Sequence, residues 1–221
     1  MNILFYFLLF ILLGGHMDTK NIHWYGHAAF RIDDDSIHIY VDPFELPSSA
    51  PKADIILITH SHFDHFSEKD IKKIRKESTK ILAPEDVNAD GNKITVVPGK
   101  EYTIGKIKIK TVPAYNIDKK FHPKEKKWVG YIITLSNGVR IYHAGDTDFI
   151  PEMKTIETDI ALLPCGGTYT MTAREAGEAA NTFKPKILIP MHWGSIVGSK
   201  EDAEGIKKYF KGEVEIKTVE K

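Results

Sequence analysis

The feature that most constrains this chain is a short apolar run, residues 54–59, followed at once by a cluster of histidines. An apolar run of this length is typical of a strand buried on both faces, as in a parallel sheet. The cluster contains His60, His62, Asp64 and His65. Imidazole and carboxylate groups bind zinc and similar cations, and one metal site explains the cluster better than a solvated, histidine-rich loop does. The sequence therefore predicts a metal site at a strand end.

Two further motifs stand where a predicted strand ends. Residues 141–147 place Asp146 directly after a glycine, and residues 187–194 place His192 between a strand and a Trp-Gly pair. Each motif alone is weak, because Gly-Asp commonly marks a turn and a lone histidine after a strand is more often structural. A carboxylate can bridge two cations that lie about 3.5–4 Å apart, which makes Asp146 a candidate bridge.

Hydrophobic patterning after residue 20 predicts short strands and then strands that alternate with helices. Predicted strands cover residues 22–25, 29–32, 37–41, 54–59, 80–83, 93–97, 101–104, 106–112, 129–135, 139–143, 160–163 and 187–190. One predicted helix begins at Ser67, whose spacing to Asp70 resembles a capping box, and runs through Arg75. Two more predicted helices cover residues 172–183 and 201–210. Strands followed by helices occur twice, which predicts an α/β (α+β) chain with two sheets face to face and helices outside, a four-layer αββα sandwich.

The charge balance argues against a nucleic-acid partner. Lys and Arg together number 30, and so do Asp and Glu, which makes the formal net charge zero. No general positive field exists to hold a phosphate backbone, although the lysine-rich residues 119–127 can form a local basic patch. We therefore expect a small-molecule substrate and no nucleic acid, and a homo-oligomer stays an open alternative.

The expected location depends on how the first sixteen residues are interpreted. Residues 3–13 are almost wholly apolar, yet shorter than the about 20 residues that a transmembrane helix needs. No Lys or Arg precedes this run and no A-x-A-like cleavage site follows it. Met17 begins an ordinary cytosolic start, so we favour an extension over residues 1–16, such as a wrongly assigned start, before a single domain over residues 17–221. A membrane anchor and a cleaved signal remain alternatives. Cys165 is the only cysteine, so no intrachain disulfide forms and a reducing cytoplasm fits best.

The three strand-end motifs, in this order, resemble the sequential motifs of the metallo-β-lactamase superfamily: residues 60–65, then Gly145-Asp146, then His192. Residues 24–30, Trp-Tyr-Gly-His-Ala-Ala-Phe, and residues 41–44, Val-Asp-Pro-Phe, are similar to one branch of it. That branch contains small metal-dependent hydrolases related to ascorbate-6-phosphate lactonase, with N-acyl-phosphatidylethanolamine phospholipase D as a more distant relative. The resemblance implies the metallo-β-lactamase fold and two divalent metal ions, with zinc favoured and manganese as the alternative.

The resemblance also implies a role for each residue of these motifs. The first metal takes His60 and His62, the second takes Asp64, His65 and His192, and Asp146 bridges the two. Asp42 lies behind the site and holds the histidine loop in orientation, as carboxylates around metal sites do. We expect His143 to point away from the metals and to make a hydrogen bond behind the site.

The chain departs from the family at one position. Relatives usually supply a third histidine to the first metal, between the histidine loop and the Gly-Asp motif. Asn116 stands where that histidine is expected, and His122 is the nearest substitute, so we predict His122 as the ligand; a surface histidine in a lysine-rich loop is the alternative. If neither residue binds, the first site is looser and favours manganese. For His27 three roles stay open: facing the substrate, supporting a ligand, or purely structural.

These assignments predict a hydrolase that uses a metal-activated hydroxide on a small ester, lactone or phosphorylated substrate. Asp64 is the predicted catalytic residue, placed to orient the hydroxide and accept its proton. Candidate pocket walls, for which core packing is the more ordinary explanation, are Trp128, Tyr169, Met171 and Trp193. The alternatives on the same fold are a phosphodiesterase or nuclease, and a phospholipase if residues 3–13 anchor the chain in a membrane.

Overall fold

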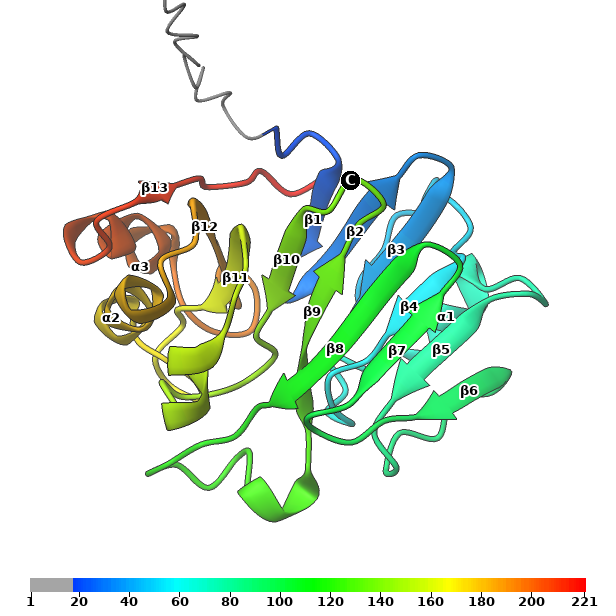
Figure 1. Ribbon diagram of the computed structural model, residues 1–221, viewed down its shortest axis with the longest axis horizontal. Coiled ribbons are helices and arrows are strands. Elements are labelled where there is room, and N and C mark those ends of the chain that lie inside the picture. Colours follow the sequence, from blue (N-terminus) through cyan, green and yellow to red (C-terminus); the bar gives the residue numbers. More distant parts are fainter. Residues whose placement is uncertain (1–17) are drawn as a thin grey trace, which may run out of the picture.

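Two β-sheets form the body of the protein in a computed structural model that describes residues 18–221 (Figure 1). The first sheet contains, in spatial order, β1 (Ile22–Gly26), β2 (Ala29–Asp34), β3 (Ile37–Val41), β4 (Ile55–Leu57), β5 (Lys80–Ala83) and β6 (Asn92–Thr95). The second contains, in spatial order, β13 (Glu213–Val214), β12 (Ile187–Met191), β11 (Ile160–Pro164), β10 (Arg140–His143), β9 (Val129–Thr134), β8 (Ile107–Pro113) and β7 (Glu101–Ile104). In both sheets the earlier strands pair antiparallel and the later ones parallel, so the two halves of the chain repeat one plan.

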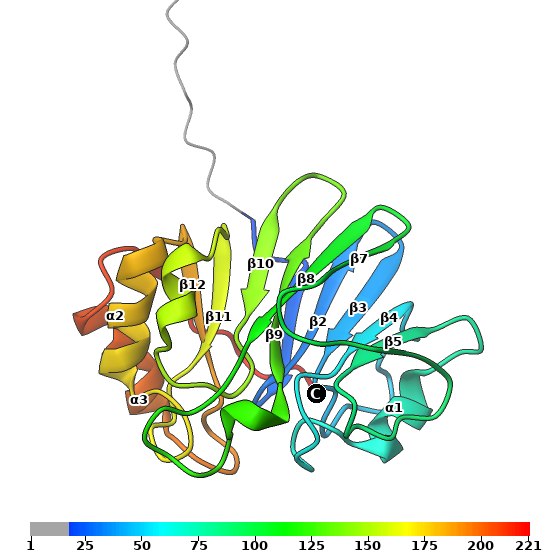
Figure 2. The ribbon, with the colours of Figure 1, turned by 60° about the horizontal axis from the view of Figure 1, so that its bottom comes forward.

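Helices lie outside the two sheets and complete the predicted four layers. Figure 2 shows α2 (Ala173–Phe183) and α3 (Lys200–Gly205) beside β11 and β12, and α1 (Glu68–Ile74) beside β4 and β5. Three short 3-10 helices, η1 (Lys124–Lys126), η2 (Pro151–Thr155) and η3 (Ile206–Lys208), occupy connections. The expected αββα sandwich of the metallo-β-lactamase fold is therefore confirmed.

The apolar run before the histidines is buried on both faces, as its composition predicts. Ile55 and Leu57 of β4 belong to the main core, which they share with Tyr131 of the opposite sheet. Ile56, between them, faces the other way and packs in a second apolar cluster with Ile71 of α1. This double burial holds β4 rigidly and fixes the start of the loop that follows it.

Element ends differ from the predicted ones where local chemistry intervenes. The helix expected over residues 201–210 becomes α3 followed by η3, because α3 ends at Gly205, a residue of low helix propensity. The helix expected over residues 172–183 begins one residue later, since Thr172 caps it and forms a capping box with Glu175. The regular pairing of β4 is three residues long, shorter than the apolar run.

Ser67 caps α1 as expected, since its Oγ accepts from the backbone N–H of Asp70 at 3.3 Å, but the side chain of Asp70 does not complete a capping box. Its carboxylate accepts a hydrogen bond from Ser67 Oγ at 2.8 Å, and it also accepts from the backbone N–H groups of Glu45 and Leu46 at 3.0 and 3.1 Å. Lys73 Nζ lies 2.8 Å away. Burial raises the pKa of Asp70, but the hydrogen bonds from Lys73 and Ser67 outweigh it, and the pKa is lowered. The carboxylate thus ties the loop after β3 to the start of α1.

Replacing Asp70 with asparagine is expected to lower the free energy of unfolding at pH 7 by about 2 kcal/mol, because a charged acceptor of four hydrogen bonds is lost. A carboxyl group whose pKa is lowered by folding stabilises the protein above its unfolded pKa of about 3.9, and that stabilisation disappears as pH falls through the folded pKa. The difference between wild type and variant should therefore shrink towards pH 3. Urea unfolding at pH 7 and at pH 3 measures this difference in the free energy of unfolding, with the exposed Asp118→Asn as the control. A difference that does not change with pH would contradict the role of the Asp70 charge.

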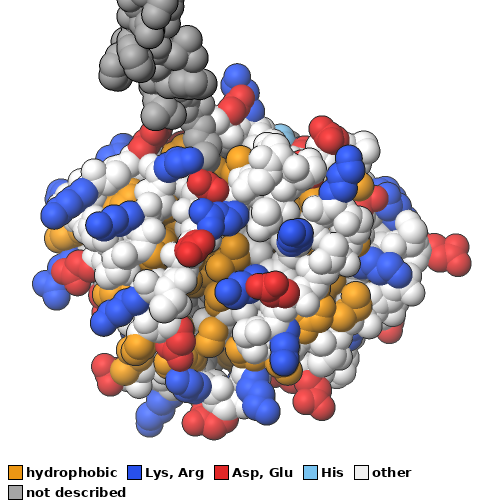
Figure 3. All heavy atoms as spheres, in the orientation of Figure 1, with side chains coloured by type: hydrophobic (Ala, Val, Ile, Leu, Met, Phe, Trp, Pro, Cys, Tyr) orange, Lys and Arg blue, Asp and Glu red, His pale blue; other side chains and the backbone are white. Residues whose placement is uncertain are grey.

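The surface carries both signs of charge. On the face drawn in Figure 3, the side chains of Lys and Arg are interspersed with those of Asp and Glu. No helix within residues 18–221 has the length and apolar character needed to cross a membrane. The interpretations of residues 1–16 and of the apolar run 3–13 lie outside the described residues.

Candidate metal centre

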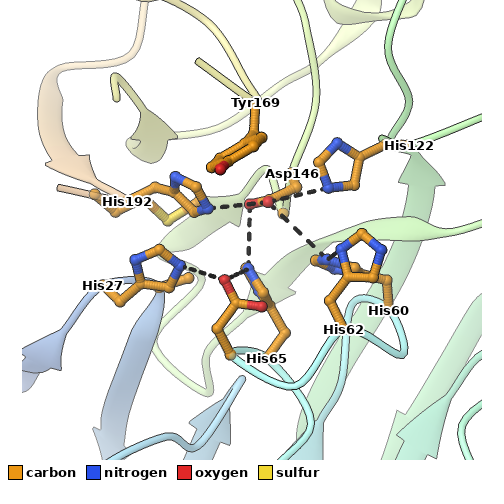
Figure 4. A network of polar contacts seen from close by, with 12 residues as sticks. His27, His60, His62, His65, His122, Asp146, Tyr169 and His192 are labelled. Carbon is orange, nitrogen blue, oxygen red and sulfur yellow. Dashed lines mark hydrogen bonds and ion pairs between the residues drawn. The ribbon is translucent and has the colours of Figure 1, made fainter. Parts of the chain in front are cut away.

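Apart from His143, which is the last residue of β10, the residues predicted for the site follow the carboxyl ends of strands. Figure 4 shows six of the histidines and Asp146 brought together in one place. His27 follows β1, Asp42 follows β3, the His60–His65 loop follows β4, Asn116 and His122 follow β8, Asp146 follows β10, and His192 follows β12. Both sheets therefore contribute to the centre, and the sandwich assembles side chains from both halves of the chain.

The backbone at this edge is unusual at several of these positions. His27, Asp42 and His192 have φ angles of 50°, 47° and 60°, in the left-handed region that side chains disfavour. Such conformations cost on the order of 1–3 kcal/mol each and occur preferentially at functional sites. Gly145 also has a positive φ, and a Cβ there would lie 3.1 Å from Thr59 Cβ, so the chain approaches the histidine loop closely just before Asp146.

Three histidines form the first group. Ligand atoms of His60, His62 and His122 all lie within 4.8 Å of one another, and His60 Nε2 is 3.1 Å from His62 Nδ1. The indole of Trp128 packs against the rings of His60 and His62, with centroids 4.9 Å from each. Trp128 therefore supports these rings, and its Nε1–H donates to Asp86 at 3.0 Å.

A second group lies beside the first. Ligand atoms of Asp64, His65, His192 and His27 also lie within 4.8 Å of one another. His27 Nε2 is 2.9 Å from Asp64 Oδ2, so His27 donates to the carboxylate. The His27 and His192 ring centroids are 3.9 Å apart. These groups contain the residues predicted for the two metals, with His27 as an addition to the second.

Asp146 stands between the two groups. Its Oδ2 lies 3.2 Å from His122 Nε2 of the first group and 3.0 Å from His192 Nε2 of the second. Its Oδ1 lies 3.4 Å from His65 Nε2. One carboxylate thus reaches both sets of nitrogens, as a bridging ligand must.

Hydrogen bonds from behind hold three of the rings so that Nε2 faces the centre. The outer Nδ1 atoms pair at 2.7–2.9 Å as follows: His60 with Thr59 Oγ1, His65 with Asp42 Oδ2, and His122 with Asn116 Oδ1. Asp42 also accepts from the backbone N–H and the hydroxyl of Thr59, at 2.7 and 2.6 Å. Such outer contacts fix the ring orientation and the tautomer of a metal ligand. The expected place of Asp42 behind the histidine loop agrees with this geometry.

The inner atoms suit divalent cations. The nitrogens His65 Nε2, His122 Nε2 and His192 Nε2 and the oxygen Asp146 Oδ1 are buried without a hydrogen-bond partner. Leaving a buried polar atom unpaired costs about 1–3 kcal/mol, so several at one point indicate that the site is built for another group. Imidazole nitrogens with carboxylate oxygens are a donor set for zinc and its neighbours. The described residues therefore fit a metal centre.

The electrostatics agree with this assignment. Burial raises the pKa of Asp146, but the charges of His192 and His65 outweigh it and hold the pKa well below its usual range. Burial lowers the pKa of His65, but Asp146 and Asp42 outweigh it and raise the pKa well above the ordinary value. The pKa of His60 is well below normal, mainly because of burial. A cation bound by His65 would therefore displace a proton, and its binding would weaken as pH falls.

His122, and not Asn116, points into the centre. The amide oxygen of Asn116 accepts from the backbone N–H of His122 at 3.0 Å and from its Nδ1 at 2.9 Å. The amide nitrogen donates to Asp148 Oδ1 and to the carbonyl oxygen of Tyr169. Both ends of the amide are thus occupied, and Asn116 orients the histidine that we propose as the third ligand.

Replacing His122 with alanine is expected to weaken metal binding at the first site by more than about 10-fold, and Asn116→Ala by about 10-fold, as typical for a residue that orients a ligand. Titration against a competing chelator measures both affinities. Asn88→Ala, an exposed position, is the control and should bind as the wild type does. A larger loss in Asn116→Ala than in His122→Ala would contradict the assignment.

The structure also places His143 and the candidate pocket walls. His143 points away from the centre, as expected: its Nε2 lies 2.9 Å from the carbonyl oxygen of Ala28. Met171 is buried, and Trp193 packs on Trp24 with centroids 4.7 Å apart, so both belong to the core. Only Tyr169 of the four candidate walls borders the open pocket, and Figure 4 shows its ring over the centre.

Some contacts have no signal in the sequence. Asp86 accepts from Trp128 Nε1 and from Ser61 Oγ, so it connects the loop after β5 to the histidine loop. Asp148 receives hydrogen bonds from Asn116, Ile117 and Lys119 and holds the segment before His122. Both carboxylates lie in ordinary-looking loops, and only the folded geometry shows their roles.

Comparison with known proteins agrees with this architecture. A family model described as a β-lactamase superfamily domain matches residues 21–192. The chain belongs to the metallo-β-lactamase superfamily. A UPF0173 metal-dependent hydrolase of Thermococcus onnurineus is 34% identical over 213 residues, which covers 88% of this chain and 94% of the relative.

Solved structures show the same fold. A protein of Parabacteroides distasonis described as a metal-dependent hydrolase is 38% identical, with a TM-score of 0.81 over 90% of this chain and 93% of the other. A metallo hydrolase of the archaeon Ignicoccus hospitalis, 24% identical with a TM-score of 0.74, shares the fold over 90% of this chain and 95% of its own. The chain is thus a metal-dependent hydrolase of the metallo-β-lactamase superfamily.

Proposed function

We propose that this metallo-β-lactamase relative binds two divalent cations and hydrolyses a small ester, lactone or phosphorylated molecule. The observation that carries the proposal is the position of Asp146, whose carboxylate reaches His122 on one side and His192 and His65 on the other. Two cations bound here would supply activation of water and stabilisation of negative charge on the substrate oxygen.

The protein's own groups prepare Asp64 for its role. Burial raises the pKa of Asp64, but the hydrogen bond from His27 and the charge of His65 outweigh it and lower the pKa to about 2. Asp64 is therefore ionised at neutral pH, as a carboxylate that binds a cation must be. The contact with His27 fixes one carboxylate oxygen, Oδ2, and leaves the other to orient water. We propose Asp64 as ligand and base, and His27 as the residue that positions it.

The donor set favours zinc at both positions. His60, His62 and His122 supply three nitrogens to the first site, and Asp64, His65 and His192 supply a mixed set to the second. Imidazole-rich sites suit zinc, whereas oxygen-rich sites suit manganese. The position of His122 supports zinc, with manganese as the ion that the same residues would accept less well.

The charge distribution supports a small-molecule substrate. The chain carries 30 basic and 30 acidic residues, and on the face in Figure 3 the two kinds are interspersed. Binding of a nucleic-acid backbone relies on clustered Lys and Arg. The pocket over the centre, with a volume of about 240 Å³, has the size for a small molecule.

A substrate screen tests the proposal. The metal-loaded protein is assayed against panels of lactones, carboxylic esters, phosphodiesters and phosphomonoesters, with the chelator-treated protein as the blank. Hydrolysis that appears only with metal and disappears in His60→Ala supports the proposal, and Asp118→Asn should retain full activity. Activity that survives chelation, or that is confined to nucleic acids, would overturn it.

A further inference from the structure

The pocket over the metal centre has a floor and walls of different character. Its floor consists of polar side chains proposed to hold the metals, including Asp146 and His192. Its walls are Phe63, Phe121, Tyr169 and Ile196. A polar reaction centre under apolar walls is the usual form of a site that binds a small molecule by its apolar part.

The wall residues are unusually exposed for their type. Of the seven large hydrophobic side chains that are exposed within residues 18–221, three line this one pocket: Phe63 at 71%, Phe121 at 46% and Ile196 at 41%. Scattered exposed apolar groups need no explanation, but a group of them around a cavity marks a binding surface. The cavity leads directly to the proposed metals, so a molecule bound in it would lie against the reaction centre.

Two of these rings rest on aromatic neighbours. Phe63 packs edge-on against Phe44, with centroids 6.2 Å apart, and Phe121 packs edge-on against Tyr169 at 4.7 Å. Edge-to-face contacts of this kind contribute about 0.5–1.5 kcal/mol each. The walls are therefore held in place before a ligand arrives, which lowers the cost of binding.

No Lys or Arg belongs to the lining of this pocket. In the lysine-rich loop beside it, Lys119 pairs with Asp148 at 2.5 Å, Lys124 with Glu152 at 3.2 Å and Lys126 with Asp86 at 3.6 Å. Recognition of a phosphate group away from a metal normally requires Arg, Lys or a row of backbone N–H donors. These walls therefore suit an uncharged group and offer no cationic side chain to a phosphate that lies away from the metals.

We propose that the walls bind an alkyl or aryl group of an uncharged carboxylic ester or lactone, so that the substrate is an acyl ester and not a phosphorylated metabolite. This inference rests on the proposed function, which it narrows. In the reaction the acyl C–O bond breaks and the oxygen of water bonds to the carbonyl carbon. One proton of water goes to the departing alcohol oxygen, and the other is released as the acid product ionises.

Binding of hydroxamates tests the walls without turnover. Acetohydroxamate and octanohydroxamate carry the same metal-binding head, so the ratio of their affinities reports only the chain. Each fully buried methylene strengthens binding by about four-fold, and with partial burial we expect octanohydroxamate to bind the metal-loaded protein about 30-fold more tightly. Isothermal titration calorimetry measures both dissociation constants.

Variants of the wall residues test whether the walls cause the difference in affinity between the two hydroxamates. Phe121→Ser and Ile196→Ser, with metal content checked, should reduce the affinity ratio to about 5-fold or less, because they remove apolar area from the walls. Val97→Ser removes an apolar side chain of similar exposure, 39%, outside the pocket and should leave the ratio unchanged. An equal affinity for both hydroxamates, or a ratio unaffected by the wall variants, overturns the inference.

Assays with esters distinguish a failure of this inference from a failure of the proposed function. Against para-nitrophenyl esters from acetate to octanoate, we expect kcat/KM to rise with chain length, and to exceed kcat/KM for para-nitrophenyl phosphate. Ester hydrolysis without dependence on chain length, or faster cleavage of the phosphate, overturns the inference but leaves metal-dependent hydrolysis intact. Tight binding of octanohydroxamate with no metal-dependent cleavage of any ester, lactone or phosphate overturns the proposed function and the substrate class with it.

Discussion

Replacing Asp146 with alanine is expected to remove at least one of the two metal ions that we propose for each chain and to abolish hydrolysis. The carboxylate is buried at 4% exposure and faces nitrogens of both histidine groups, His122 at 3.2 Å and His192 at 3.0 Å. Without its negative charge, two cations about 3.5–4 Å apart would repel each other at full strength in a buried site. Once one ion is bound, the other should therefore bind much more weakly than it does in the wild type.

Elemental analysis of the dialysed variant measures this loss. Asp146→Asn serves as the isosteric partner: it keeps the shape and one acceptor oxygen, so it should fold as the wild type does and still bind fewer ions. Asp118→Asn, which removes an exposed carboxylate, should retain the metal content of the wild type. Full metal content in Asp146→Ala would exclude the bridging role, whatever happens to turnover.

The fold could be predicted because its main signals are local. The run at residues 54–59 is apolar at every position but its ends, and the structure buries alternate side chains of β4 in two different cores. Strand ends followed by His60, Asp146 and His192 gave the candidate site, because the sandwich brings such ends together. Hydrophobic periodicity, and the residue types that follow a strand, can both be recognised within a short stretch of consecutive residues.

What the sequence could not give depends on contacts between distant segments. Asn116 and His122 are six residues apart, and only the folded loop decides which of the two faces the centre. The contact of His27 with Asp64 joins residues 37 positions apart across a turn with a positive φ, which no hydrophobic pattern encodes. Asp86 looks like any loop carboxylate, yet it holds Trp128 behind the histidine rings. Polar contacts of this kind depend on the folded geometry and produce no periodic pattern in the sequence.

Replacing Asp64 with asparagine separates two roles of one side chain. The amide is nearly isosteric, and its oxygen can still accept the hydrogen bond that His27 donates at 2.9 Å, so the loop should keep its shape. The variant carries no negative charge, so affinity for the second metal should fall. It also cannot accept a proton, so turnover should fall by about 10²–10⁴-fold if Asp64 is the general base.

Turnover measured against metal concentration, with occupancy followed in parallel, distinguishes the two roles. If Asp64 acts as base, we expect turnover to remain at least about 100-fold below wild type when excess metal has restored occupancy. If it acts only as a ligand, saturating metal should restore turnover with occupancy. Because the pKa of Asp64 is about 2, the wild-type carboxylate is ionised across the neutral range. Its titration therefore does not affect the comparison of wild type with Asp64→Asn. Full rescue at saturating metal would therefore discard the base assignment and leave the metal centre intact.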